Sequence, residues 1–275
     1  MKIAVTGGTG FIGNHLITHL LKEGHYVLVT GTNEEKAKAY EWFSKVKFVT
    51  LNINSTISEE KIMEIASCQK LIHLAWSGLP NYKELFHFEV NLVPHYNFLK
   101  SLVEMGMEDI TVAGTCMEYG VKDGCLTVDS PVDPQNAYAI SKDTLRRFLV
   151  QLQTKNNFNL KWVRLFYMFG NGQSDKSILS QLDRALDNGD DAFNMSGGEQ
   201  LRDYLPVEKV AENISKLSIQ QYKTGIYNCC SGIPISIRTL VEAHLKRRNK
   251  KIKLNFGYYP YPDFEAMAFW GKNNI

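Results

Sequence analysis

The feature that most constrains this fold is a glycine-rich turn near the N-terminus. Residues 2–6, KIAVT, have the continuous apolar pattern of a buried strand, and residues 11–22 carry apolar side chains at helical spacing. In such a turn the first glycine permits tight bending, the second lets the backbone approach a pyrophosphate, and the third allows close packing. The helix N-terminus adds N–H donors. The sequence therefore predicts a dinucleotide site at Gly7, Thr9, Gly10, Phe11, Ile12 and Gly13.

The rest of the first 170 residues alternates apolar strands with helices. Strands that are apolar throughout are typical of a parallel sheet covered on both faces, so we expect an α/β fold with a doubly wound parallel (Rossmann) sheet. After residue 170 the elements become shorter. This change predicts a dinucleotide-binding domain at 1–170, to which some later segments return, and a small C-terminal, mainly substrate-binding lobe at 171–275. Strands are expected at 2–6, 26–30, 47–50, 70–75, 109–114 and 160–166, and helices at 33–45, 83–105 (kinked near Pro94) and 135–155.

Composition excludes several classes of protein. The net charge of +2 argues against a nucleic-acid binder, and no apolar run approaches the roughly 20 residues of a membrane span. Five cysteines without a CxxC pair suggest free thiols in a reducing cytoplasm. His15 and His19 lie one turn apart but lack further ligands, so no metal site is expected. The basic run at 246–253, KRRNKKIK, is interpreted as a solvated helix end and loop, with an anion-steering patch as the alternative.

The end of the second strand bears on the cofactor. A carboxylate that would bind the adenosine ribose is missing from Val29–Asn33, whereas Thr30, Asn33 and nearby lysines could accept a 2′-phosphate. This pattern favours NADP over NAD. The alternative is that Thr30 and Asn33 merely begin the next helix.

A tyrosine and a lysine lie one helical turn apart. Tyr138 and Lys142 are four residues apart at the start of an expected helix, so they share a face. A nearby ammonium would lower the pKa of the phenol and make Tyr138 a proton donor or acceptor. Thr115 follows the fifth strand, at the edge where sites form, and its hydroxyl could hold a carbonyl oxygen beside Tyr138.

Together these segments resemble the extended short-chain dehydrogenase/reductase family, in its nucleotide-sugar epimerase/dehydratase branch. That resemblance implies a nucleotide-sugar substrate and a role in surface-polysaccharide sugar synthesis. It covers nearly the whole chain. The matching segments are the glycine turn, LIHLA at 71–75, GTCMEYG at 114–120, PVDPQNAYAISK at 131–142, RLFYMFG at 164–170, LRDYLPVEKVA at 201–211 and GIYNCCSG at 225–232.

The resemblance implies roles for individual residues. Thr115, Tyr138 and Lys142 would be the catalytic trio, and Tyr138 and Lys142 would also contact the cofactor. Arg202 would bind the nucleotide or diphosphate of the substrate, since a bidentate guanidinium suits that task. Tyr167 replaces an asparagine that the family often has. Further cofactor contacts are implied at Asn52, Ile53, Leu74, Ala75, Trp76 and Asn91, and further substrate contacts at Met117 and Tyr167.

The loop after the fifth strand also distinguishes between reactions. Dehydratases of this branch carry an acidic pair where this chain has Cys116 and Met117, and Glu118 is shifted by one and should point elsewhere. This loop and YYPYPDFEAMAFWG at 258–271 resemble the enzymes that reduce 4-keto-6-deoxy nucleotide sugars. We therefore expect a 4-ketoreductase. A 4-epimerase with tightly bound NAD and a non-catalytic nucleotide-binding scaffold are the alternatives. The resemblance further implies a homodimer formed through helices at 95–105 and 138–153.

Overall fold

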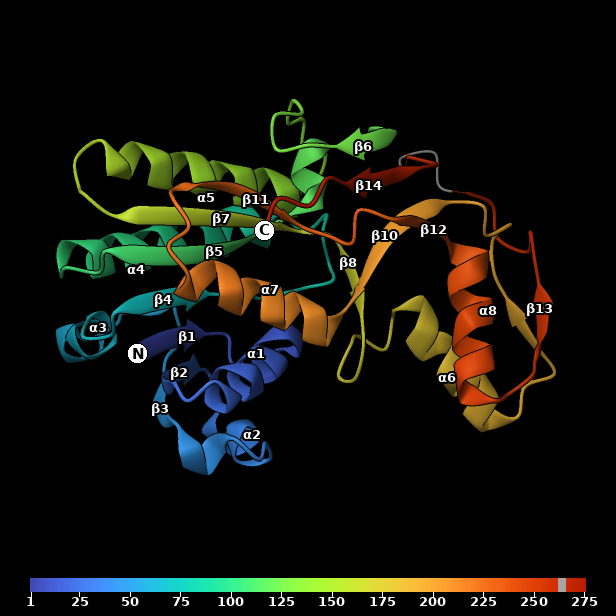
Figure 1. Cartoon of the computed structure of the whole chain (residues 1–275), viewed down its shortest axis with the longest axis horizontal. Coiled ribbons are helices and arrows are strands. Elements are labelled where there is room, and N and C mark those ends of the chain that lie inside the picture. Colours follow the sequence, from blue (N-terminus) through green and yellow to red (C-terminus); the bar gives the residue numbers. More distant parts are fainter. Residues whose placement is uncertain (262–265) are drawn as a thin grey trace.

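The computed structural model describes residues 1–261 and 266–275. Its centre is a parallel seven-stranded sheet with the order β3-β2-β1-β4-β5-β7-β11 (Figure 1). The chain reverses direction across the sheet between β1 and β4, and ligands of such folds bind outside the carboxyl ends of the strands at this point. The strands are β1 (Lys2–Thr6), β2 (Tyr26–Gly31), β3 (Lys47–Thr50), β4 (Lys70–His73), β5 (Asp109–Thr115), β7 (Asn159–Leu165) and β11 (Gly225–Cys229).

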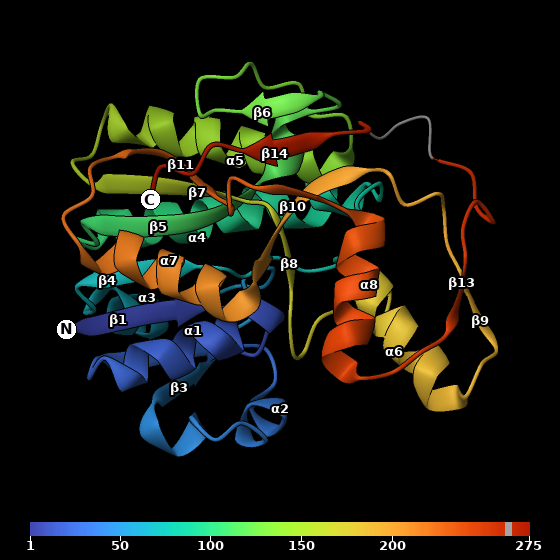
Figure 2. The ribbon, with the colours of Figure 1, turned by 45° about the vertical axis from the view of Figure 1, so that its right-hand side comes forward.

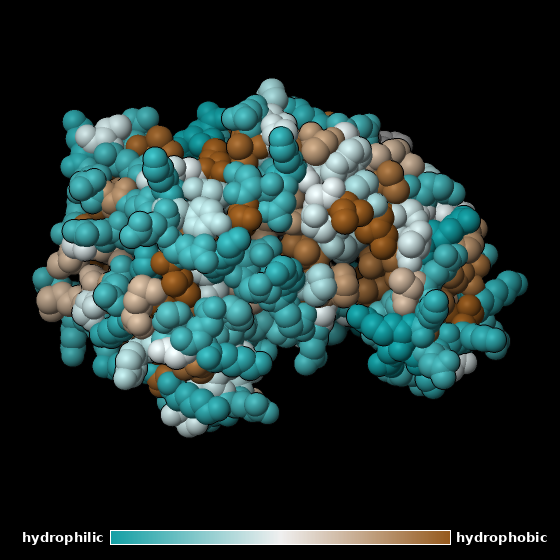
Figure 3. Space-filling view, in the orientation of Figure 1, coloured by the Kyte–Doolittle hydropathy of each residue, from teal (hydrophilic) through white to brown (hydrophobic). Residues whose placement is uncertain are grey.

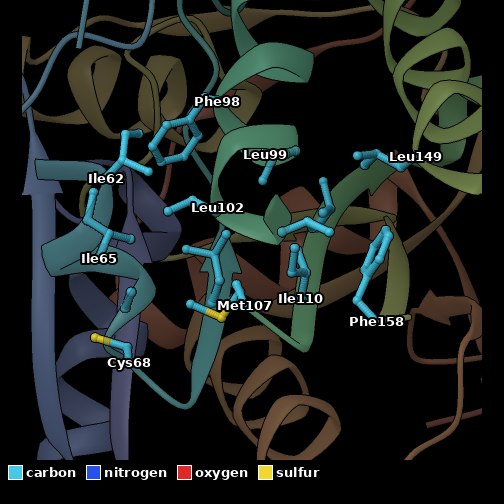
Figure 4. Packing of buried hydrophobic residues seen from close by; sticks show 14 of the residues in the cluster. Ile62, Ile65, Cys68, Phe98, Leu99, Leu102, Met107, Ile110, Leu149 and Phe158 are labelled. Carbon is cyan, nitrogen blue, oxygen red and sulfur yellow. The ribbon is translucent and has the colours of Figure 1, made fainter. Parts of the chain in front are cut away.

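Helices cover both faces of this sheet, which confirms the doubly wound arrangement. On one face α1 (Phe11–Lys22) and α7 (Val207–Ile219) pack side by side (Figures 1 and 2). The other face is covered by α3 (Glu59–Ala66), α4 (Val93–Glu104) and α5 (Ala137–Gln153). Figure 4 shows the core on that side, where apolar side chains of the three helices meet those of the strands: Ile62, Ile65, Phe98, Leu99, Leu102, Ile110 and Leu149.

A smaller lobe lies beyond the carboxyl ends of the strands (Figure 2). It contains a three-stranded sheet of β12 (Pro234–Ser236), β10 (Leu201–Pro206) and β8 (Tyr167–Phe169). Helices α6 (Ile178–Asn188) and α8 (Ile237–Arg248) pack against it in a separate apolar cluster. Two further strand pairs are β9 (Ala192–Asn194) with β13 (Lys253–Asn255), and β6 (Gly124–Leu126) with β14 (Phe269–Gly271).

The chain leaves the large sheet and returns to it. Helix α7 and strand β11 belong to the Rossmann domain, although they follow α6 and β10 of the lobe. Strand β8 begins three residues before residue 170 and already pairs with the lobe. The two units are therefore interwoven, and the cleft between them is built from segments far apart in sequence.

Two expected helices differ from the structure. The helix predicted over 83–105 consists of a π-helical segment, η2 (His87–Leu92), followed by α4. Pro94 lies in the first turn of α4, where its missing N–H costs little. The helix predicted over 33–45 is also interrupted: only the short α2 (Glu34–Lys38) and a 3₁₀ turn, η1 (Phe43–Lys45), form there.

The face seen in Figure 3 is mostly hydrophilic, with apolar side chains in small groups. None of the helices in the described part of the chain has the length and apolar character that crossing a membrane requires. The basic run at 246–253 lies at the end of α8 and in the loop that follows, and its six charged residues are exposed. Arg248 pairs with Asp183 and Asp187 of α6. These contacts agree with the interpretation of a solvated helix end.

Candidate active site

The glycine turn is shaped as a phosphate cradle. Gly7 has a φ of +73°, and a Cβ on it would lie 2.8 Å from the backbone N of Ala75. A Cβ on Gly13 would lie 2.3 Å from the carbonyl O of Gly7, so both positions require glycine. Gly10 caps α1 without a side-chain hydrogen bond, and no acidic residue occupies the first turn. The free N–H groups of this helix N-terminus fit the pyrophosphate of a dinucleotide.

Thr30, near the end of β2, and Asn33, just after it, have structural roles that the sequence left open. The carbonyl O of Thr30 accepts hydrogen bonds from the N–H groups of Gly7 (3.2 Å) and Gly8 (3.4 Å), and Thr30 is only 2% exposed. The side chain of Asn33 accepts from the N–H of Lys36 at 2.9 Å and caps α2. The interpretation that these residues fasten the turn and begin the next helix is the one the geometry supports.

The adenine side of the expected cofactor site is formed by the loop after β3. Asn52 is exposed, and its Oδ1 accepts a hydrogen bond from the backbone N of Asn54 at 3.1 Å. Ile53 is buried against the core that includes α3. Thr9, in the glycine turn, accepts a hydrogen bond from the Tyr40 hydroxyl through its carbonyl O at 3.1 Å. These contacts fix the loop after β3 and the glycine turn.

The segment after β4 lies in contact with the start of the glycine turn. The backbone N of Leu74 donates to the carbonyl of Thr6 at 3.3 Å, and the N of Ala75 donates to the Thr6 hydroxyl at 3.3 Å. Asn91, expected to contact the cofactor, is fully buried behind this segment. Its Nδ2 donates to the carbonyl O of Ser77 (3.0 Å), and its Oδ1 accepts from the Ser77 hydroxyl (2.6 Å). Asn91 therefore fixes the turn at Ser77.

Thr115, Tyr138 and Lys142 come together at the carboxyl edge of the sheet. Asn136 caps α5 by accepting from the N–H of Ala139 at 2.9 Å, which sets Tyr138 in the first turn and Lys142 one turn later. Thr115, at the end of β5, lies beside Tyr138. The Lys142 Nζ donates to the carbonyl O of Ala113 at 3.0 Å.

Burial dominates the electrostatics of this trio. It raises the pKa of Tyr138, and only the neighbouring Thr115 hydroxyl acts in the opposite direction. Burial also lowers the pKa of Lys142 to about 7, although the Glu118 carboxylate works against it. In the chain alone burial therefore outweighs any lowering of the Tyr138 pKa by Lys142. The physical reason is that both groups are shut off from water, which disfavours the phenolate as well as the ammonium.

Glu118 is a residue whose importance the sequence did not reveal. Its carboxylate is fully buried and accepts from the Thr115 N–H (2.9 Å), the Trp162 indole N–H (2.9 Å) and the Arg164 Nε (2.7 Å). It points away from the cleft, as expected from its shifted position, and is not placed for elimination chemistry. The one sequence feature that could have indicated its role is the Thr115–x–x–Glu118 spacing, which is typical of a capping box.

The residues expected to contact the substrate come from both the Rossmann domain and the lobe. Met117 donates its backbone N–H to the Thr115 hydroxyl at 3.2 Å. The Arg202 guanidinium is only 3% exposed and lies 4.8 Å from the Phe269 ring centroid and 6.0 Å from that of Tyr167. The segment 258–271 supplies Phe269 to this group, whereas its residues 262–265 lie outside the described part of the chain.

Comparison with known proteins places this geometry in a family. A dTDP-6-deoxy-L-talose 4-dehydrogenase (NAD(+)) from Aggregatibacter actinomycetemcomitans is 32% identical over 98% of this chain and 99% of its own length. A dTDP-4-dehydro-6-deoxyglucose reductase from Escherichia coli is 26% identical over 92% of this chain and 84% of its own length.

Solved structures share the fold. The structure of MoeE5 in complex with UDP-glucose and NAD superimposes with a TM-score of 0.82 at 21% identity, covering 99% of this chain and 90% of the other. The model of the NAD dependent epimerase/dehydratase family matches residues 3–230, which include the glycine turn, Thr115, Tyr138, Lys142 and Arg202. This chain therefore belongs to the NAD dependent epimerase/dehydratase family.

Proposed function

We propose that the protein reduces the 4-keto group of a nucleoside diphosphate-linked 4-keto-6-deoxy sugar with NADH, or catalyses the reverse oxidation. The observation that carries this proposal is the convergence of Thr115, Tyr138 and Lys142 beside a glycine turn suited to a dinucleotide. The 32% identity with a nucleotide-sugar 4-dehydrogenase over nearly the whole of both chains supports the same chemistry.

The proposed roles of the trio follow from their positions. The chemistry supplied by bound nicotinamide is hydride transfer at the sugar C4. Tyr138 donates its phenolic proton to the oxygen that becomes an alkoxide, and the Thr115 hydroxyl holds that oxygen in line. Lys142 stabilises the phenolate that remains on Tyr138 and binds the ribose next to the nicotinamide. In the oxidative direction Tyr138 accepts the proton instead.

NAD(H) is the cofactor that we propose. The preference for NADP drawn from the second strand is not supported by the comparisons, because the 32% identical relative is named as an NAD(+) enzyme and structural neighbours hold NAD.

Arg202 and the rings beside it are the proposed contacts for the diphosphate and nucleotide of the substrate. The guanidinium is buried between the lobe and Phe269, so a phosphate bound there would be recognised in a largely dry environment. Tyr167 and Met117 would then face the sugar, from β8 and from the turn after Thr115.

A homodimer is a further part of the proposal. The outer surfaces of η2, α4 and α5 carry apolar side chains that are at least a third exposed, namely Val90, Val93, Ile140 and Phe148. Tyr96 of α4 and Phe148 of α5 also pack together, 5.4 Å apart. Pairing these helices with a second copy would remove this surface from water. A cytoplasmic location and a role in surface-polysaccharide sugar synthesis fit a nucleotide-sugar substrate.

The test is single-turnover absorbance at 340 nm with NADH or NADPH and a panel of dTDP-, GDP- and CDP-linked 4-keto-6-deoxy sugars. Loss of one equivalent of NADH with one of these sugars would support a 4-ketoreductase. No loss with any sugar, together with NAD that stays bound through purification and interconversion of 4-epimers, would point to the epimerase. Binding of nucleotide sugars without either reaction would leave a non-catalytic scaffold.

A further inference from the structure

Trp76 contacts both members of the Tyr138–Lys142 pair through its side chain. It follows β4 by three residues, where the family resemblance implies only a cofactor contact. The Lys142 Nζ lies over the indole, 4.2 Å from the ring centroid. The Tyr138 ring meets the same indole edge-on, with centroids 6.3 Å apart. A single aromatic side chain is thus shared by the two groups that would move the proton.

The indole is held by its own hydrogen bond. Its Nε1 donates to the Nδ1 of His87 at 3.0 Å, and His87 has the carbonyl O of Asn81 at 3.1 Å from its Nε2. An indole N–H can only donate, so the Nδ1 of His87 must accept and its Nε2 must carry the proton. His95 packs on the indole with ring centroids 4.7 Å apart. Contacts with His87 of η2 and His95 of α4 therefore fix the position of the Trp76 indole.

The surroundings of Lys142 leave its charge with few partners. It is 1% exposed, its Nζ donates a hydrogen bond to the neutral carbonyl of Ala113, and no carboxylate of the described residues forms an ion pair with it. The negative face of an aromatic ring stabilises a cation most strongly where water is excluded. The titratable groups that face Lys142 are Tyr138 on its own helix, Glu118 from η3 (Cys116–Tyr119), His73 from β4, His87 from η2 and His95 from α4.

The three histidines do not add charge at neutral pH. Burial is the largest cause that lowers the pKa of His73 and His87, and it lowers the pKa of His95 to about 3. His73 and His95 also share a hydrogen bond of 2.9 Å between their rings. Besides the Ala113 carbonyl that accepts its hydrogen bond, the Glu118 carboxylate and the Trp76 ring are therefore the groups close to Lys142 that favour the ammonium.

We propose that Trp76 is a positioning residue that keeps the Lys142 ammonium charged and directed at the reacting end of the cleft. This inference rests on the proposed function, because the charged ammonium matters only if Tyr138 transfers a proton. The indole face takes the place of a counter-ion. A carboxylate there would repel the developing phenolate, whereas a neutral ring stabilises the cation without adding negative charge beside Tyr138.

The contact itself can be tested without substrate by nitrogen-15 labelling of the indole groups. The chain has four tryptophans, and Trp76→Phe assigns the signal of interest. We expect the Trp76 indole signal to follow one ionisation with a midpoint near pH 7, and this titration to disappear in Lys142→Met. A signal that is flat, or that titrates equally in Lys142→Met, would overturn the proposal.

The consequence for activity is tested by pH profiles of kcat/KM. Trp76→Leu removes the ring and should move the alkaline limb to lower pH by about one unit, because Lys142 then loses its proton more easily. Trp76→Phe keeps a weaker ring and should move it less. Phe158→Leu is the matched control, since Phe158 lies in the same apolar core but far from the cleft. Phe158→Leu should lower the melting temperature and leave the alkaline limb of the pH profile at the same pH.

A purely structural Trp76 would reduce activity at every pH without moving the limb, and that outcome would refute the inference. The proposed function fails in a different way. If no sugar is turned over while the indole signal still follows Lys142, the contact exists and the assigned reaction is wrong.

Discussion

Two lysines are buried at opposite ends of the same sheet, and their partners differ. Lys161, near the start of β7, is fully buried, and its Nζ lies 2.7 and 2.9 Å from the two carboxylate oxygens of Asp109. Lys70 adds a second ammonium to that carboxylate at 2.7 Å. Lys142, at the carboxyl edge, has a carbonyl oxygen and the face of an indole instead.

The difference separates a structural cation from one that is suited to chemistry. Burial lowers the pKa of Lys161 too, but the paired Asp109 carboxylate opposes this effect and ties Lys161 to the start of β5. Lys142 lacks such a partner, so burial lowers its pKa to about 7, close to the pH at which a proton can be exchanged. The sheet thus carries a charge pair that supports the fold at one end, and at the other end an ammonium whose charge changes near neutral pH. Four variants test this division.

The largest effect is expected from Tyr138→Phe. Loss of the phenolic proton should reduce kcat by about 1,000-fold, the scale of general acid catalysis, which corresponds to about 4 kcal/mol. NADH binding, followed by fluorescence titration, should change little. Tyr222→Phe is the matched control, since the Tyr222 carbonyl accepts from Asn159 at the other end of the sheet, and it should keep full turnover. Unchanged turnover in Tyr138→Phe would exclude it as the proton donor.

Asp109→Asn should act on stability and spare activity. It leaves two ammonium groups without their counter-charge and should lower the free energy of unfolding by about 3 kcal/mol, near the lower limit for a buried pair because Asp109 is partly exposed. Urea unfolding measures the loss, and kcat at 25 °C should stay as in the wild type. Lys70→Met, which leaves the Lys161–Asp109 pair intact, should cost much less. Equal losses of unfolding free energy in Asp109→Asn and Lys70→Met would contradict a structural role for the Lys161–Asp109 pair.

The pH dependence of stability tests the effect of burial on Lys142. The pKa of Lys142 is about 7 in the folded chain and has its ordinary value of 10.5 in the unfolded chain. Between these values the unfolded chain binds more protons, so this group makes stability rise with pH. From pH 7 to pH 9 its contribution is about 2 kcal/mol. Lys142→Met should lack that rise in urea unfolding, and parallel curves for the two proteins would show that Lys142 keeps an ordinary pKa.

Arg202→Lys probes the lobe and has the smallest expected effect. The lysine keeps the charge but loses the planar fork, so the KM for the nucleotide sugar should rise about tenfold while kcat falls less. Arg248→Lys, in the exposed run at the end of α8, should leave both constants unchanged. A fall in kcat alone would place Arg202 with the reacting atoms and not with the nucleotide.

Local pattern predicted much of the fold because the strands are apolar throughout and alternate with helices. The glycine turn, the six strands β1 to β5 and β7 of the large sheet, and the helix that carries Tyr138 and Lys142 all follow from short segments. Strand β11 was not among the expected strands. GIYNC is short, and its place beside β7 depends on α7 crossing the sheet after the chain has visited the lobe.

The sequence by itself determined the chemistry that is available: a phosphate cradle, a hydroxyl at the end of a strand, and a phenol one turn before an amine. Each depends on residues close together in the chain, where backbone geometry alone sets the spacing. Only the tertiary structure decided what surrounds them. Glu118 faces Arg164, Asn91 faces Ser77, and Lys142 faces Trp76, because packing brings distant segments together and excludes water from between them. The pKa values follow from that exclusion, and so they belong to the folded chain.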